Sequence, residues 1–494
     1  MASQHPDHAS KPYWHNKEYI TTQHEHKECF LMYSDLGIQE YKWDWEGKLV
    51  DEAIMERLLH RYYNYFKANP IGKEKFLTFR LPNPKAETEF RLARAFMGIL
   101  SSAALTKQVG LHTPPLFEVI LPMTETADEM IAIQEAFKEI TELKHVLYRV
   151  EGNTLKNIEV IPLFEQVSTI INSDKIIKEY ITLNIKKFKK IPAYLRPYVA
   201  RSDPSLNSSL VPTIVAIKIA LSRYKKFTRE SGIPLYPIIG SASLPFRGGL
   251  TPHTVDQFTN EYSGIKTALI QSAFRYDYEK EAVKKAIQKL NEILPKGEAR
   301  DITPQEEKNL IEIIPFFQTA YKSVIEEMAP VINQIASLLP LRRERVQHTG
   351  LFGYSRGMDK VTLPRAITFT GSLYSIGIPP ELIGTGRGIR DTITAGKIEL
   401  LEKTYINLKA DLVQAGKFLN KELLHTMAQQ YPELKKVEED IKNIEKYAGA
   451  ELGPQNAQEK EHVELAKKIY KGFTQEKIPQ EILTRAALLR KSMG

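Results

Sequence analysis

Ile158-Glu-Val-Ile-Pro-Leu-Phe-Glu165 is the stretch of the sequence that decides the fold. Most of its residues are large and apolar, and the run ends in a carboxylate. Such a short apolar run is typical of a strand buried on both faces, as in a parallel sheet. In a parallel barrel the last side chain of a strand reaches the carboxyl-end rim, where active sites lie. We therefore expect Glu165 to be a functional residue on that rim.

A second stretch, Arg196-Pro-Tyr-Val-Ala-Arg-Ser-Asp203, has the same plan, with an apolar middle and a polar end. It would bring Arg201, Ser202 and Asp203 to the same rim. Two carboxylates on neighbouring strand ends, beside an arginine, indicate a hard divalent ion that holds an anionic substrate. We therefore predict that Glu165 and Asp203 are metal ligands and that the cofactor is Mg²⁺ or Mn²⁺.

Strand and helix patterns alternate along the first part of the chain. The expected strands are 29–34, 76–80, 117–122, 158–165, 196–203, 236–240 and 267–271, and the helices between them are 51–68, 86–104, 127–143, 173–189 and 208–230. This alternation predicts an α/β fold with a TIM-type (β/α)8 barrel. Amphipathic runs without strand signals follow at 280–293, 304–338, 398–430, 432–448 and 458–471. They predict extensive additional helices and a helical C-terminal region, which would cover one side of the barrel or form a subunit interface.

Composition narrows the class of protein. The 494 residues carry a net charge of +8, with acidic and basic residues interleaved, and contain one cysteine, Cys29. No stretch of eighteen apolar residues predicts a membrane span, and the N-terminus does not resemble a secretion signal. A single cysteine excludes an internal disulfide and fits a reducing compartment, so we expect a cytoplasmic protein. The basic cluster 186–190 is expected to be a solvated helix face, with neither nucleic acid nor a membrane as partner.

Arginines at strand ends and glycine turns form a second candidate group. Arg80 ends a predicted strand, and Arg247 is followed by Gly248 and Gly249. Glycines beside an arginine let backbone amides approach an anion that the guanidinium binds in two places. The further candidates are Arg356, in Gly353-Tyr-Ser-Arg356, and Arg365, in Leu363-Pro-Arg365. A single arginine of this kind is usually a surface ion pair, but several beside two rim carboxylates favour a site for a small polyanion.

Several cofactor motifs are missing from the sequence. There is no P-loop for ATP and no Ala-Met-Lys-Met signal for biotin attachment. Gly384-Thr-Gly-Arg-Gly388 lacks the spacing of a dinucleotide-binding turn and is expected to be a loop. We therefore expect no ATP, no biotin and no nicotinamide cofactor.

At seven places the chain resembles phosphoenolpyruvate carboxylase in its short, archaeal-type form. These are Ser3-Gln-His-Pro-Asp7, Leu77-Thr-Phe-Arg80, Val160-Ile-Pro-Leu-Phe-Glu165, Arg201-Ser-Asp-Pro204, Phe246-Arg-Gly-Gly249, and the pair Gly353-Tyr-Ser-Arg356 and Leu363-Pro-Arg365. The chain departs from the long form of the family by having Leu206 and Asn207 where a lysine stands. It also has one Arg-Gly-Gly motif instead of two and no asparagine near the C-terminus.

The resemblance implies a carboxy-lyase that joins bicarbonate to phosphoenolpyruvate, giving oxaloacetate and phosphate and supplying C4 acids. It implies that His5, Arg80, Arg247, Arg356 and Arg365 are catalytic, that substrate is also bound by Arg201, Gly248 and Gly249, and that Glu165 and Asp203 bind the metal. It also implies a homotetramer. The expected organisation is an N-terminal segment at 1–28 that contributes to the active site, a barrel with inserted helices at 29–365 and a helical region at 366–494, acting as one catalytic unit.

Two other functions are consistent with parts of this pattern. A magnesium-dependent lyase or aldolase acting on a pyruvate enolate would need the two carboxylates but not the arginines or His5. A basic helical scaffold that binds nucleic acid would show salt-sensitive binding and would have no use for rim carboxylates. Phosphate release that depends on bicarbonate would distinguish the carboxylase from both.

Overall fold

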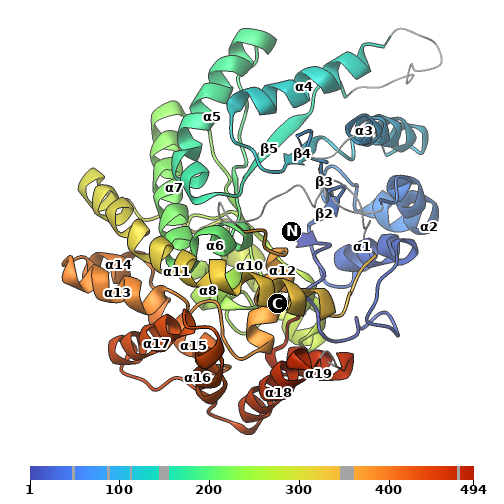
Figure 1. Ribbon diagram of the computed structural model, residues 1–494. Helices are drawn as coiled ribbons and strands as arrows, with labels where there is room; N and C mark the ends of the chain where they lie inside the picture. Colours follow the sequence, from blue (N-terminus) through green and yellow to red (C-terminus); the bar gives the residue numbers. More distant parts are fainter. Residues whose placement is uncertain (47–49, 86–89, 112–113, 144–154, 345–360, 476–478) are drawn as a thin grey trace.

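Eight parallel strands form a barrel in the computed structural model, which describes residues 1–46, 50–85, 90–111, 114–143, 155–344, 361–475 and 479–494 (Figure 1). The strands follow one another around the sheet in chain order, and each pairs in parallel with the next. They are β1 (Ala2–Ser3), β2 (Glu40–Asp44), β3 (Phe76–Arg80), β4 (Glu118–Leu121), β5 (Glu159–Phe164), β6 (Tyr198–Val199), β7 (Ile238–Gly240) and β8 (Thr267–Leu269).

The ring closes between the last strand and the first. The backbone N–H of Ser3 donates to the carbonyl of Ile270 at 3.0 Å, and the N–H of Ile270 donates to the carbonyl of Met1 at 2.9 Å. The predicted (β/α)8 barrel is therefore confirmed. Its first strand is made by the extreme N-terminus of the described chain, which places the residues after Ser3 at the carboxyl-end rim.

Helices pack around the barrel because each carries one apolar face. Those that follow strands β2 to β8 are α2 (Ile54–Ala68), α3 (Arg91–Gln108), α4 (Ala127–Thr141), α5 (Val167–Phe188), α6 (Ser202–Ser208), α7 (Leu210–Ser231), α8 (Val255–Glu261), α9 (Ser272–Tyr276) and α10 (Lys280–Ile293). Helix α1 (Glu25–Ser34) lies between β1 and β2. The main core lies between these helices and the outward side chains of the strands, such as Tyr41, Trp43 and Phe79.

The inside of the barrel has a separate composition. A small apolar cluster comes from the inward side chains of neighbouring strands: Ile120, Ile161, Leu163, Tyr198, Ala200, Ile238 and Leu269. At the amino-terminal end of the strands, Arg196 pairs with Glu40 at 2.7 Å and with Glu118 at 2.5 Å. A buried ion-pair network therefore lies at the amino-terminal end of the barrel.

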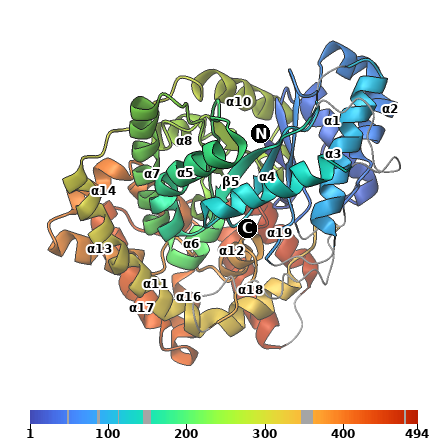
Figure 2. The same ribbon diagram turned by 90° about the horizontal axis from the view of Figure 1, so that it is seen from above.

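The later helices gather on one side of the barrel in both views (Figures 1 and 2). They are α11 (Pro304–Leu338), α12 (Ala366–Ser375), α13 (Thr385–Thr394), α14 (Ile398–Thr404), α15 (Leu408–Gly416), α16 (Lys421–Gln430), α17 (Leu434–Ala448), α18 (Ala457–Thr474) and α19 (Gln480–Arg490). Helix α12 begins directly after Arg365, and its first residues reach the carboxyl-end rim. The helical C-terminal region predicted from the sequence is confirmed. Within the described residues no helix is both long and apolar enough to cross a bilayer.

Most predicted elements are confirmed within a few residues, and three predictions are wrong. Residues 29–34 belong to helix α1, since their apolar side chains Cys29, Met32 and Tyr33 repeat at helical spacing. Strand β6 ends at Val199, so residues 200–203 lead into α6 instead of extending the strand. The glycine-rich stretch 384–388 is the start of α13, where buried glycines let Asp440 and Phe317 approach the helix closely. Strands β1 and β2 were not predicted.

Candidate active site

A cavity of about 80 Å³ lies at the carboxyl ends of the strands. Every strand except β4 places a residue on it, either from the strand itself or from the segment that follows. Its charged and polar lining is His5, Lys42, Glu46, Arg80, Glu165, Tyr198, Arg201, Ser202, Asp203, Arg247, Gln271 and Arg365. Residues far apart in the sequence therefore meet at the rim expected for a parallel barrel.

The two candidate metal ligands line the same cavity. Glu165 follows the last residue of β5, and Asp203 lies in the first turn of α6, which begins three residues after β6 ends. Carboxylate oxygens are the donors that Mg²⁺ and Mn²⁺ prefer, so the donor chemistry fits a hard divalent ion. Within the described parts of the chain no group of three or more His, Cys, Asp or Glu side chains is arranged to hold a metal. A two-carboxylate site suits Mg²⁺, which usually keeps waters and substrate oxygens as its other ligands.

Arg80 is held by two carboxylates. Its Nε donates to Asp44 Oδ1 at 2.8 Å, and its Nη1 lies 2.6 Å from Glu46 Oε2. Although burial opposes ionisation, Arg80 and Lys42 hold the pKa of Asp44 well below its ordinary value. Burial likewise opposes the charge of Arg80, but Asp44 and Glu46 raise the pKa of its guanidinium. The group is therefore a fixed, permanently charged cation at the end of β3.

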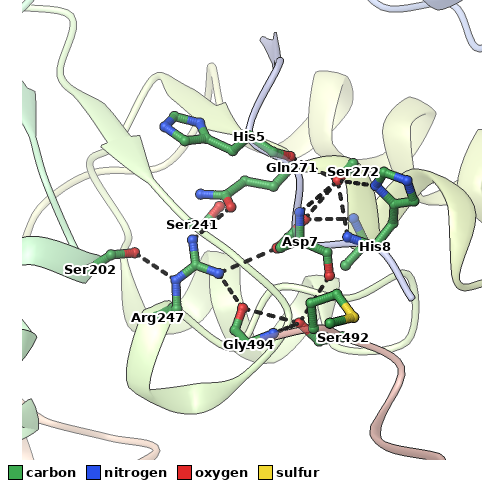
Figure 3. A network of polar contacts seen from close by, with 12 residues as sticks. His5, Asp7, His8, Ser202, Ser241, Arg247, Gln271, Ser272, Ser492 and Gly494 are labelled. Atoms are coloured by element: carbon green, nitrogen blue, oxygen red, sulfur yellow. Dashed lines mark hydrogen bonds and ion pairs between the residues drawn. The ribbon is translucent and has the colours of Figure 1, made fainter. Parts of the chain in front are cut away.

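Arg247 lies at the centre of a second polar network (Figure 3). Its Nε donates to Ser202 Oγ at 3.2 Å, its Nη2 donates to Gln271 Oε1 at 2.7 Å, and its Nη1 donates to the carbonyl oxygen of Gly494. Only 1% of its surface is exposed, and burial lowers the pKa of the guanidinium. These contacts fix the planar fork at the cavity wall, as bidentate recognition of an oxyanion requires.

The N-terminal segment is docked against the start of α9 (Figure 3). Ser272 Oγ accepts hydrogen bonds from the backbone N–H groups of Asp7 at 2.9 Å and His8 at 3.1 Å, and it donates to the His5 carbonyl at 2.7 Å. Asp7 Oδ1 accepts from the N–H of Ala273 at 2.7 Å. Burial raises the pKa of the Asp7 carboxyl against the opposing charge of Arg247, whose Nη1 lies 3.5 Å from Oδ2. The position of His5 is thus fixed by its neighbours, and its Nδ1 lies 2.9 Å from Ser3 Oγ.

The remaining candidates divide into three groups. Arg365 lines the cavity as the residue before α12. Arg201 also reaches the wall, but its guanidinium donates to the carbonyls of Pro245 and Phe246 and to Tyr262, so its contacts hold the loop that carries Arg247. Gly248 and Gly249 line a neighbouring pocket instead, and Gly248 has a φ of 131° that favours glycine. Arg356 lies outside the described residues.

Sequence reasoning missed Lys42, Glu46 and Gln271. The first two belong to Glu40-Tyr-Lys-Trp-Asp-Trp-Glu46, in which charged and aromatic residues alternate strictly. Period-two alternation is the signal of a strand with one polar face, and here that face points into the barrel. Gln271 carries no such signal, because only the fold places it against Arg247.

The cavity wall contains five lysine and arginine side chains, namely Lys42, Arg80, Arg201, Arg247 and Arg365, and three carboxylates, namely Glu46, Glu165 and Asp203. An excess of fixed positive charge in a buried site favours anions that carry more than one charge. The two carboxylates that follow β5 and β6 would take a divalent ion, which adds further positive charge. The arrangement is suited to stabilising negative charge that moves between the oxygens of a phosphorylated substrate.

Comparison with known proteins points to the same chemistry. The family model described as phosphoenolpyruvate carboxylase matches residues 1–494. A phosphoenolpyruvate carboxylase of Leuconostoc mesenteroides is 38% identical over 94% of this chain and 92% of its own length. The phosphoenolpyruvate carboxylase of Metallosphaera sedula is 38% identical over 100% of this chain and 99% of its own length. That of Methanothermobacter thermautotrophicus is 37% identical over 85% of this chain and 87% of its own length. The chain therefore belongs to the phosphoenolpyruvate carboxylase family.

Proposed function

We propose that this carboxy-lyase catalyses its family's reaction in the cavity described above, joining phosphoenolpyruvate and bicarbonate to give oxaloacetate and phosphate. The observation that carries the assignment to this site is the meeting of His5, four candidate arginines and both candidate metal ligands around one space. These residues come from segments spread along the barrel sequence and from the residue that precedes α12. A structural ion-pair network alone would not require them to surround a cavity.

Charge explains why the reaction would need these residue types. Phosphoenolpyruvate carries a phosphate and a carboxylate, and bicarbonate brings a further negative charge. Each close pair of like charges costs roughly 4 kcal/mol at an effective dielectric of about 20. In the proposal, Arg80, Arg247 and Arg365 bind the phosphoryl and carboxylate oxygens and offset this repulsion, and Arg356 joins them.

The first chemical step is transfer of the phosphoryl group. A bicarbonate oxygen attacks phosphorus, the bond from phosphorus to the enol oxygen breaks, and carboxyphosphate and the enolate of pyruvate result. The arginines stabilise the equatorial oxygens as charge moves from the attacking oxygen to the leaving one. A divalent ion held by Glu165 and Asp203 would supply electrostatic stabilisation of the enolate oxygen.

The second step uses the N-terminal segment. We propose that His5 accepts the carboxyl proton of carboxyphosphate while its carbon–oxygen bond breaks, which releases carbon dioxide and phosphate. The methylene carbon of the enolate then attacks carbon dioxide and forms the new carbon–carbon bond of oxaloacetate. The docking of residues 5–8 on Ser272 supports this role, because a proton-transfer group has to be held within hydrogen-bond reach.

A coupled assay tests the proposal. Oxaloacetate formation is followed with malate dehydrogenase and NADH, and phosphate release is followed in parallel. Both should require bicarbonate and a divalent cation, Mg²⁺ or Mn²⁺, with no dependence on ATP or biotin. Phosphate release at the full rate without bicarbonate, or cleavage of a larger acid to pyruvate, would instead favour the lyase or aldolase.

We also propose a cytoplasmic homotetramer that supplies C4 acids. The compartment is supported by the single cysteine, Cys29, which is buried in α1, where burial raises the pKa of its thiol and makes it unreactive. The tetramer is supported by the resemblance described from the sequence. Light scattering of the purified protein tests the oligomeric state.

A further inference from the structure

Lys42 is a buried lysine that the reaction described so far does not use. It lies on β2, in register with Ser3 of β1 and Thr78 of β3. Its neighbours Tyr41 and Trp43 face the helices, so Lys42 projects into the barrel together with Glu40 and Asp44. None of its surface is exposed to solvent, yet it lines the cavity that holds His5 and Arg80.

The contacts of its ammonium group are few. Nζ lies 3.0 Å from Asp44 Oδ1, with which it interacts through one N–H group, and it has no other hydrogen-bond partner among the described residues. Asp44 is not part of the cavity wall and already accepts from Arg80 at 2.8 Å. A buried ammonium is costly unless its N–H groups are satisfied. The ammonium therefore has N–H groups to offer to an anion in the cavity.

The placement of Lys42 indicates which anion it meets. Lys42 and His5 belong to the β1–β2 side of the barrel, whereas Glu165 and Asp203 follow β5 and β6 on the opposite side. In the proposed reaction the enolate oxygen develops its charge on the side of the two carboxylates. The carboxyl group that starts as bicarbonate and becomes part of carboxyphosphate has to lie near His5.

We propose that Lys42 is a further catalytic residue whose ammonium binds the carboxyl oxygens of bicarbonate and then of carboxyphosphate. This inference rests on the proposed function. The physical reason is that the carboxyl group of bicarbonate needs a cation of its own, because the arginines bind the phosphate and the carboxylate of phosphoenolpyruvate. Burial and the nearby Arg80 lower the pKa of Lys42 to about 8, against the opposing effect of Asp44, which leaves the group mostly protonated at neutral pH.

Lys42→Met tests the inference, because methionine fills similar space without charge. The KM for bicarbonate should rise at least tenfold while the KM for phosphoenolpyruvate changes less than threefold, and less oxaloacetate should form for each phosphate released. Lys42→Arg retains the charge and should recover part of the bicarbonate affinity. If the methionine variant does not fold, as judged by circular dichroism, Lys42→Gln takes its place in the same comparison with Lys42→Arg.

Lys218→Met is the matched control. Lys218 is also largely buried and forms an ion pair with Glu261 at 2.7 Å, but it lines a separate pocket. Its replacement should leave both KM values within threefold of the parent. Equal rises of the two KM values in Lys42→Met would overturn the inference and show that Lys42 only positions Asp44 and Arg80. Unchanged bicarbonate kinetics would also overturn it, whereas a parent protein that makes no oxaloacetate would refute the proposed function instead.

Discussion

Replacing Ser272 with alanine should undock the N-terminal segment and uncouple the two halves of the reaction. Ser272 is fully buried at the start of α9, and its Oγ accepts from the backbone N–H groups of Asp7 and His8. The His5 carbonyl would keep one partner, the backbone N–H of Ser272 at 3.3 Å, but both amides would lose theirs.

The size of the effect follows from those two amides. A buried N–H group left without a partner costs about 1–3 kcal/mol, so the variant should lose at least about 2 kcal/mol of docking free energy. At 1.36 kcal/mol per factor of ten, the ratio of docked to undocked segment should fall at least roughly 30-fold. Because a small misplacement of a catalytic group is enough to slow a reaction greatly, molecules with an undocked segment should form oxaloacetate much more slowly.

Three measurements check this prediction. Hydrogen exchange in peptides from residues 1–10 should become faster, oxaloacetate formation should fall much further than phosphate release, and His5→Asn should show the same imbalance. Ser263→Ala is the control, because Ser263 Oγ donates to the Glu298 carbonyl at an exposed position. The reasoning is refuted if Ser272→Ala forms oxaloacetate at the parent rate and its N-terminal peptides exchange as slowly as those of the parent.

Three further predictions concern other parts of the molecule. Asp203→Asn should preserve the fold, weaken Mn²⁺ binding in calorimetric titration and nearly abolish turnover; full activity at limiting Mg²⁺ would remove Asp203 from the ligand set. Arg365→Lys keeps the charge but not the planar fork, so oxaloacetate formation should fall about 10²–10³-fold, and a rate within a factor of two of the parent would show that Arg365 does not bind the reacting groups. Burial opposes ionisation of Glu28, but Arg343 and Arg275 lower the pKa of its carboxyl to about 2. The ion pairs between Glu28 and these arginines therefore stabilise the folded protein fully above pH 4.5, and this stabilisation is lost as the pH falls from 4.5 toward 2. Glu28→Gln should therefore lose stability in urea at pH 7 and show a flatter decline between pH 4.5 and 3; a decline as steep as the parent's would mean that other carboxylates govern acid unfolding.

How far the sequence predicts this protein depends on the length of each signal. Strands β3 to β5 and the long helices α10 and α11 were predicted because their side chains repeat at a regular period over enough residues. Strand β1 has only two residues, Ala2 and Ser3, and no period can be read from two positions. Residues 29–34 show the opposite error, since a short apolar run fits either a strand or one face of a helix.

The candidate site divides in the same way. Glu165 and Arg80 could be found because each ends a recognisable strand. Arg247 and Arg365 belong to the group of arginines found at strand ends and glycine turns, and the family resemblance added His5. The local sequence cannot predict the hydrogen bond between Ser272 and Asp7, because the two residues are 265 positions apart and meet only when β8 pairs with β1. Lys42 needed both the sequence and the structure. The alternation of charged and aromatic residues shows which side of the strand Lys42 lies on, but only the closed barrel makes that side part of a buried cavity lined by other cations. Periodicity and strand ends are therefore properties of the sequence by itself, whereas the pairing of distant side chains depends on how the closed barrel brings its strand ends together.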